Sequence, residues 1–83
     1  MKEPRKSVTH ELKTLPEFFK ALCDGTKTFE LRRNDRDFQI DDILLLKEWD
    51  GERYTGRSYI AAISYIVADG PWLMPGYCCL GLK

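Results

Sequence analysis

Between residues 7 and 13, apolar and polar side chains alternate strictly. Val8, His10 and Leu12 fall on one face and polar residues on the other, which is the pattern of a half-buried strand. His10 therefore shares a face with two core residues. Either it is an interior histidine with a satisfied hydrogen bond, or it lines a pocket and titrates near neutral pH.

A helical period replaces the alternation over residues 14–24. Thr14 and Glu17 match a capping box, and Pro16 fits the first turn, where a missing backbone N–H costs nothing. Gly25 suits the position after the helix end, which favours a left-handed backbone. Four apolar residues have the spacing of one buried stripe: Leu15, Phe18, Phe19 and Leu22. This pattern assigns both phenylalanines to the core.

Alternation returns over residues 26–33 and predicts a second strand. Its two faces carry different chemistry: Phe29 with Leu31 on one, and Thr28, Glu30 and Arg32 on the other. Lys27 has the parity of the apolar pair, and a buried ammonium would need a partner because an isolated buried charge is very costly. Glu30, three residues on, is the obvious candidate.

The remainder of the chain predicts three more strands. Residues 34–42 are rich in Asn and Asp and read as a turn-like segment. The continuous apolar run from Ile43 to Leu46 is typical of a strand buried on both faces. Asp50-Gly51 is a hairpin signal. The strands are expected at residues 43–49, 58–67 and 77–82, with an irregular loop at residues 69–76.

The order of elements predicts an α+β fold that is mainly β, with about five strands and one short helix after the first strand. Closure into a small mixed β-barrel is the natural way to protect the sheet edges. We expect one domain over residues 7–83, preceded by a disordered or frayed tail at residues 1–6.

Composition places the chain among ordinary soluble proteins, since 43% of its 83 residues are hydrophobic and 31% are charged. Its formal net charge of zero argues against bulk electrostatic binding to duplex nucleic acid, which neutralises many phosphates. A local basic patch remains possible. No apolar run approaches the ~20 residues that cross a bilayer, and no signal peptide is visible.

The three cysteines, Cys23, Cys78 and Cys79, form neither a disulfide framework nor a metal-binding pattern. They are best explained as small apolar residues in a reducing compartment. We therefore expect a cytoplasmic protein with no metal. We also expect a monomer with no cofactor.

The stretch from Gly25 to Phe38 concentrates both signs of charge. Its cluster of Lys27, Glu30 and Arg32 has three possible uses. It can hold a phosphate or carboxylate, it can perform acid–base chemistry if burial shifts a pKa, or it can be a structural ion-pair network. Arg33 and Arg36 lie close by in the sequence, and their density favours a site.

Gly25-x-Lys27-x-x-Glu30-x-Arg32 resembles the GxKxxExR signature of the ASCH domains, a branch of the PUA-like fold. A wider pattern is similar to the DUF3850 family of small bacterial and phage proteins, and it spans roughly residues 10–82. The segments that carry this second resemblance are His10–Lys13, Lys27–Phe38, Tyr54–Arg57 and Gly76-Tyr77 with Leu80-Gly81.

The resemblance implies a PUA-like β-barrel with a cleft beside the signature, and RNA binding as its activity. Some ASCH relatives are amidohydrolases that remove an acyl group from a modified cytidine, using the signature lysine and a hydroxyl residue three positions later. Lys27 matches that lysine, but Glu30 stands at the hydroxyl position. A second departure is Asp41, where the family commonly has glycine; Asp tolerates such turns, so we expect no change of fold.

The leading hypothesis is a module that binds RNA or a nucleotide-like ligand. Its rival is a small amidohydrolase on an acyl-modified nucleoside, with Lys27, Glu30 and His10 as titrating groups. A third possibility is a protein partner held by Trp72 and the Met74-Pro75 loop. Tyr54, Trp72 or Tyr77 could stack a base, although packing explains each one as well. The expected ligand-binding residues are His10, Lys13, Lys27, Glu30, Arg32, Arg33, Arg36, Tyr54 and Arg57.

Overall fold

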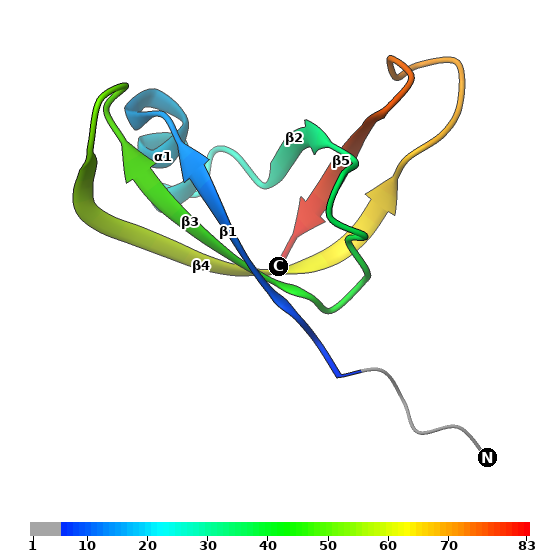
Figure 1. The fold of residues 1–83 in the computed structure, drawn as a ribbon, viewed down its shortest axis with the longest axis horizontal. Helices are drawn as coiled ribbons and strands as arrows, with labels where there is room; N and C mark the ends of the chain where they lie inside the picture. Colours follow the sequence, from blue (N-terminus) through cyan, green and yellow to red (C-terminus); the bar gives the residue numbers. More distant parts are fainter. Residues whose placement is uncertain (1–5) are drawn as a thin grey trace.

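The computed structural model describes residues 6–83, so most of the tail expected at residues 1–6 lies outside the described residues. The chain is mainly β, with one short helix after the first strand, as predicted (Figure 1). Among the described residues, no helix is long and apolar enough to cross a membrane. The elements are β1 (Thr9–Thr14), α1 (Pro16–Cys23), β2 (Phe29–Arg33), β3 (Ile43–Trp49), β4 (Tyr54–Val67) and β5 (Tyr77–Leu82).

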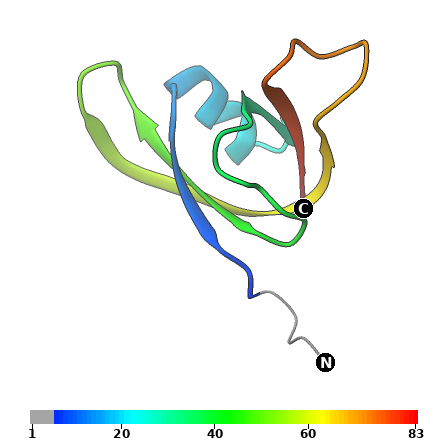
Figure 2. The same ribbon diagram turned by 45° about the vertical axis from the view of Figure 1, so that its right-hand side comes forward.

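The five strands form one mixed sheet in the order β1-β3-β4-β5-β2. β1 and β3 are parallel, and the other neighbours are antiparallel. β4 is long enough to pair with β3 along its first part and with β5 along its second, with a register shift between Ile63 and Tyr65. The sheet therefore folds over along β4, and α1 packs against β3 and β4 (Figures 1 and 2).

The expected barrel is not closed. β1 and β2 are the two edges of the sheet, and no backbone ladder joins them. Side chains span the gap instead, because Arg32 donates to the carbonyl of Lys13 at 2.6 Å and Arg36 to the carbonyl of Glu11 at 2.7 Å. The prediction of a closed barrel was therefore wrong. Guanidinium groups, rather than a neighbouring strand, donate hydrogen bonds to the carbonyl groups at the edge of β1.

The core lies on the inner face of the folded sheet, where alternate residues of the strands are buried. These residues, with one side chain from α1 and one from the β2–β3 connection, are Leu12, Leu44, Leu46, Ile63, Cys78, Leu80, Leu22 and Phe38. On β3, only Leu44 and Leu46 of the apolar run are fully buried, whereas Ile43 and Leu45 are half-buried. Burial on both faces was therefore only partly correct.

Several local predictions for the helix can be compared directly. Gly25 has φ +83°, and its N–H donates to the Leu22 carbonyl at 3.3 Å, as expected for a residue after a helix end. The capping box was wrong: Leu15 is the N-cap and makes no side-chain capping bond. Thr14 is instead the last residue of β1, where it is buried. The stripe holds for Phe19 and Leu22, which are buried, but the side chains nearer the helix start are open to solvent.

β2 turns Glu30 inward and its apolar residues outward, an orientation that the sequence pattern left open. Glu30 is buried at 3% exposure, while Phe29 and Leu31 are 42% and 59% exposed. The apolar pair therefore faces outward, and the carboxylate faces the space between the sheet edges. Neighbouring cations make this arrangement possible, because a buried carboxylate is tolerated when it is paired and hydrogen-bonded.

The turns behave as their residues suggest. Asp50 closes the β3–β4 hairpin, with its side chain accepting from the N–H groups of Glu52 and Arg53 at 2.9 Å. The tightness of this hairpin lets β4 begin at Tyr54, earlier than expected. Asp41 adopts φ +75°, a conformation that Asp tolerates better than most residues, so it replaces a glycine there without changing the fold.

Candidate ligand-binding site

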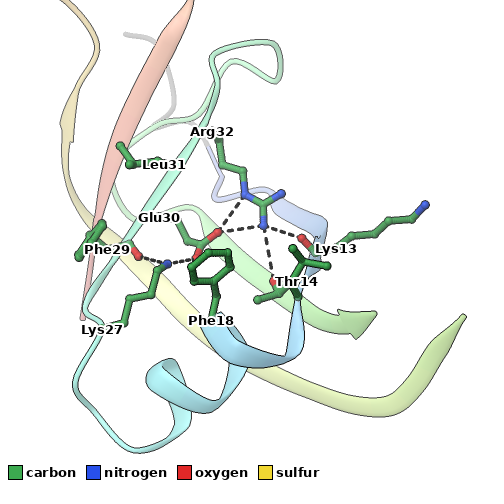
Figure 3. Close-up of a pocket in the computed structure, with 9 residues that line it drawn as sticks. Lys13, Thr14, Phe18, Lys27, Phe29, Glu30, Leu31 and Arg32 are labelled. Carbon is green, nitrogen blue, oxygen red and sulfur yellow. Dashed lines mark hydrogen bonds and ion pairs between the residues drawn. The ribbon is translucent and has the colours of Figure 1, made fainter. Parts of the chain in front are cut away.

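A pocket of about 460 Å³ opens between the end of β1, the start of α1 and the strand β2 (Figure 3). Its walls are apolar, formed by Leu15 and Phe18 from the helix side and by Phe29 and Leu31 from β2. Its polar residues gather at one place, around Glu30. The lining residues are Lys13, Thr14, Leu15, Phe18, Lys27, Phe29, Glu30, Leu31 and Arg32.

Glu30 is the centre of the polar part of the pocket. Lys27 donates to its Oε1 atom. Arg32 donates from Nε to its Oε2 atom at 2.9 Å, and Nη2 of Arg32 forms an ion pair with the same oxygen at 2.9 Å. Both carboxylate oxygens are therefore occupied. Two cations and one anion leave the cluster with one net positive charge, which favours ligands that are anionic or rich in hydrogen-bond acceptors.

Lys27 faces the pocket, which the sequence pattern left open. Its ammonium also donates to the Phe29 carbonyl at 2.6 Å. It lies 5.7 Å from the centre of the Phe18 ring and 5.0 Å from the centre of the Phe29 ring, distances at which a cation is attracted to an aromatic face. The ammonium is thus held in place by a carboxylate, a carbonyl and two rings.

Arg32 joins the pocket to the opposite sheet edge. Its Nη2 atom donates to the Lys13 carbonyl and lies 3.5 Å from the Thr14 hydroxyl. Lys13 contributes mainly its backbone, because its ammonium lies 4.5 Å from the centre of the Trp49 ring and its side chain points away from Arg32 (Figure 3). Four of the expected ligand-binding residues therefore meet in this pocket, namely Lys13, Lys27, Glu30 and Arg32.

Arg33 and Arg36 lie beside a second cavity of about 200 Å³, which shares Arg32 with the first. Arg36 is fixed by its bond to the Glu11 carbonyl. Arg33 lies 5.8 Å from the centre of the Tyr77 ring. The three arginines that lie close together in the sequence therefore also lie close together in space, along the gap between the two sheet edges.

His10 takes the first of its two possible roles. It is buried, its Nε2 atom lies 2.8 Å from Asp42 Oδ2, and its ring meets Phe38 edge-to-face at 4.7 Å. Asp42 also accepts from the N–H groups of Val8 and Gln39 at 3.0 Å. The histidine holds the start of β1 to the turn before β3 and does not line the Lys27 pocket.

Arg57 and Tyr54 also lie away from the pocket. Arg57 forms a two-pronged pair with the buried Glu48, Nε to Oε1 and Nη2 to Oε2, both at 2.9 Å. The bonds from Arg57 and from the Thr55 hydroxyl lower the pKa of Glu48 below its ordinary value. The ammonium of Lys47 lies over the Tyr54 ring, 4.4 Å from the ring centre. Both predicted site residues belong to the β3–β4 hairpin.

Sequence reasoning missed the apolar walls of the pocket. Phe18 was assigned to the core with Phe19, yet it is 44% exposed. One signal could have identified it: a two-turn helix has a narrow buried face, so four residues do not all fit beneath it. Among residues 6–83, no three His, Cys, Asp or Glu side chains gather as metal ligands would.

Comparison with known proteins now adds a family. A model for a domain of unknown function, DUF3850, matches residues 9–82. The chain belongs to the DUF3850 family. It is also similar to the "Uncharacterized 12.9 kDa protein in GpA 3'region" of Escherichia phage P2, with 34% identity over 64 residues, which are 77% of this chain and 59% of that protein. The placement of DUF3850 proteins among the ASCH and PUA-like domains stays a prediction.

Proposed function

We propose that this DUF3850 protein is a monomeric, cytoplasmic module that binds one base of a single-stranded RNA, or a free nucleotide, in the Lys27 pocket. The observation that carries the proposal is the combination of apolar walls with a polar end that has one net positive charge. A nucleobase needs both features, because its faces stack on apolar or aromatic groups and its edges form hydrogen bonds.

Phe18 is the proposed stacking group. It is exposed, it lines the pocket, and it lies next to the ammonium of Lys27. Lys27 and Arg32 are the proposed donors to carbonyl or phosphate oxygens. Both are already fixed by Glu30, so they lose little further freedom when a ligand binds. The resemblance to ASCH and PUA-like domains supports the same ligand class.

A titration of ¹⁵N-labelled protein with short single-stranded RNAs, followed by NMR shift perturbation, tests the proposal. We expect shifts at Leu15, Phe18 and residues 27–32. Phe18→Ala should weaken binding by about 10-fold or more, since a stacked base contributes roughly 1–3 kcal/mol. Trp72→Ala is the matched control, because Trp72 is an exposed aromatic residue away from the pocket, in the loop between β4 and β5. Equal losses in the two variants would contradict the assignment of this pocket.

Charge is tested in the same way. Lys27→Ala should weaken binding, whereas Arg53→Ala, which removes one positive charge from the exposed end of the hairpin, should have little effect. Affinity for RNA should also fall with rising salt concentration, because phosphate contacts release counterions. Affinity that is independent of salt and of Lys27 would overturn the proposal.

The amidohydrolase alternative rests on the contact between Lys27 and Glu30 at the end of the pocket. In this geometry Lys27 donates to a carboxylate and a carbonyl, rather than presenting a lone pair to a substrate. Nucleophilic lysines need that lone pair, so binding is the better supported function. Release of the acyl group from an acylated cytidine by the wild type, and its loss in Lys27→Ala, would establish the enzyme instead.

A further inference from the structure

The cavity beside the Lys27 pocket also has a net positive charge. Its lining contains three guanidinium groups and one carboxylate, a net charge of two. It is enclosed by Leu12 and Phe38 at its apolar end. The six lining residues are Leu12, Arg32, Arg33, Asp35, Arg36 and Phe38.

Two of these guanidinium groups are held in position by the free edge of β1. Arg32 donates to the carbonyl of Lys13 and Arg36 to that of Glu11. These carbonyls are two residues apart, which is about 6.6 Å along a strand. A phosphate placed between the two groups could accept from both of them, because arginine presents a planar fork that matches phosphate oxygens.

Each of the two groups has donors left for a ligand. Arg36 uses only Nη1 on the described protein, and Arg32 uses Nε and Nη2. Within residues 6–83, the remaining nitrogens, Nη1 of Arg32 and both Nε and Nη2 of Arg36, have no protein acceptor. Capping of the β1 edge therefore occupies a minority of the available N–H groups.

We propose that this second cavity is a phosphate subsite, formed by Arg32, Arg33 and Arg36, for the phosphate of the nucleotide whose base occupies the Lys27 pocket. The inference rests on the proposed function and goes beyond it, because it makes the ligand a phosphorylated nucleotide rather than a nucleoside. Arg32 lines both cavities and would therefore place the phosphate next to the base.

The test compares ligands that differ only in phosphate. Cytidine, cytidine 3′-monophosphate, cytidine 5′-monophosphate and a cytidine dinucleotide are titrated into wild-type protein and into Arg36→Gln. The wild type should bind a phosphorylated form at least ~10-fold more tightly than cytidine. In Arg36→Gln this ratio should fall below ~2-fold, with the affinity for cytidine itself unchanged. Stronger binding of the dinucleotide than of either monophosphate would identify an RNA strand as the source of the phosphate.

Two control variants guard against a folding defect. Arg36→Lys keeps the charge and should retain a measurable preference for phosphate. Arg53→Gln removes a distant charge and should keep the wild-type ratio. A phosphate preference that is absent from the wild type, or that is unchanged in Arg36→Gln, would overturn the subsite.

Failure of the subsite and failure of the proposed function have different signatures. If cytidine binds the pocket and phosphate adds nothing, the subsite is wrong and the base pocket stands. If no nucleoside or nucleotide perturbs residues 27–32, the base pocket is wrong. Inorganic phosphate then provides a separate probe: shifts at the side chains of Arg33 and Arg36 would retain the anion site, and no shifts would remove both.

Discussion

Phe18 and Phe19 are adjacent on α1, and each begins a chain of contacts from an aromatic ring through a cation to a buried glutamate. On the pocket side, the Phe18 ring lies 5.7 Å from the ammonium of Lys27, which pairs with Glu30. Phe18 is exposed, and all three residues line the cavity. We call these three residues the pocket-side cluster.

The hairpin-side cluster consists of Phe19, Arg57 and Glu48. The Phe19 ring lies 5.2 Å from the guanidinium of Arg57, which makes a two-pronged pair with Glu48. Phe19 is buried at 2% exposure, and the Thr55 hydroxyl supplies a further bond to the carboxylate at 2.6 Å. No cavity described above includes any of these residues.

The comparison shows that the two clusters share their ion pairs but differ in whether a cavity reaches them. Both glutamates are buried and both are fully hydrogen-bonded, so neither the ion pair nor the aromatic ring distinguishes the two clusters. What differs is the phenylalanine, which is buried in the core on the hairpin side and forms an open wall of a cavity on the pocket side. A buried ion pair is therefore weak grounds for a site unless an accessible cavity reaches it.

The largest expected effect comes from removing the aromatic ring of each phenylalanine in turn. Phe19→Ala should lower the free energy of unfolding by about 3–5 kcal/mol, as deletion of a buried ring does. Phe18→Ala should cost about 1 kcal/mol, since its ring is only partly buried. Urea unfolding followed by circular dichroism measures both. Similar losses in the two variants would show that Phe18 is a core residue and that the pocket is filled in solution.

The next effect concerns the charge at the end of the pocket. Glu30→Gln leaves Lys27 and Arg32 without their shared anion. It should lower the free energy of unfolding by about 2–3 kcal/mol, below the usual cost of breaking a fully buried pair because water reaches both cations. A double-mutant cycle with Lys27→Met measures the pair directly. A coupling energy near zero would mean that the buried charge of Glu30 is stabilised by Arg32 alone and not by Lys27.

The sequence predicted the order of the elements, because alternation, a helical stripe and a hairpin signal each depend on residues close together in the chain. It did not predict the orientation of β2. The alternation of Phe29 and Leu31 with Glu30 and Arg32 is the same whichever face is inside. The choice is made by contacts with Lys13 and Thr14, which are distant in sequence.

The candidate site divides in the same way. Lys27, Glu30 and Arg32 could be grouped from their spacing, because they lie within one short strand and its approach. Arg57 could not be excluded from that group, since its partner Glu48 lies on the neighbouring strand. The prediction of a closed barrel was wrong for a related reason. A hydrogen bond from a guanidinium group to the carbonyl of an edge strand leaves no periodic pattern in the sequence.

The smallest effect is confined to acid pH and tests the hairpin-side cluster. Bonds from Arg57 and Thr55 lower the pKa of Glu48 from its ordinary value of 4.5. A carboxyl whose pKa is lower in the folded state adds stability that is fully present above its unfolded pKa and is lost as the pH falls through its folded pKa. The difference in unfolding free energy between wild type and Glu48→Gln should therefore be constant near neutral pH and shrink below about pH 4.5.

Arg57→Gln should weaken the same acid dependence, because it removes the main cause of the lowered pKa of Glu48. A wild-type advantage that persisted unchanged into strong acid would mean that packing, and not the charge of Glu48, holds this end of the hairpin, and the parallel between the two clusters would then end at their geometry.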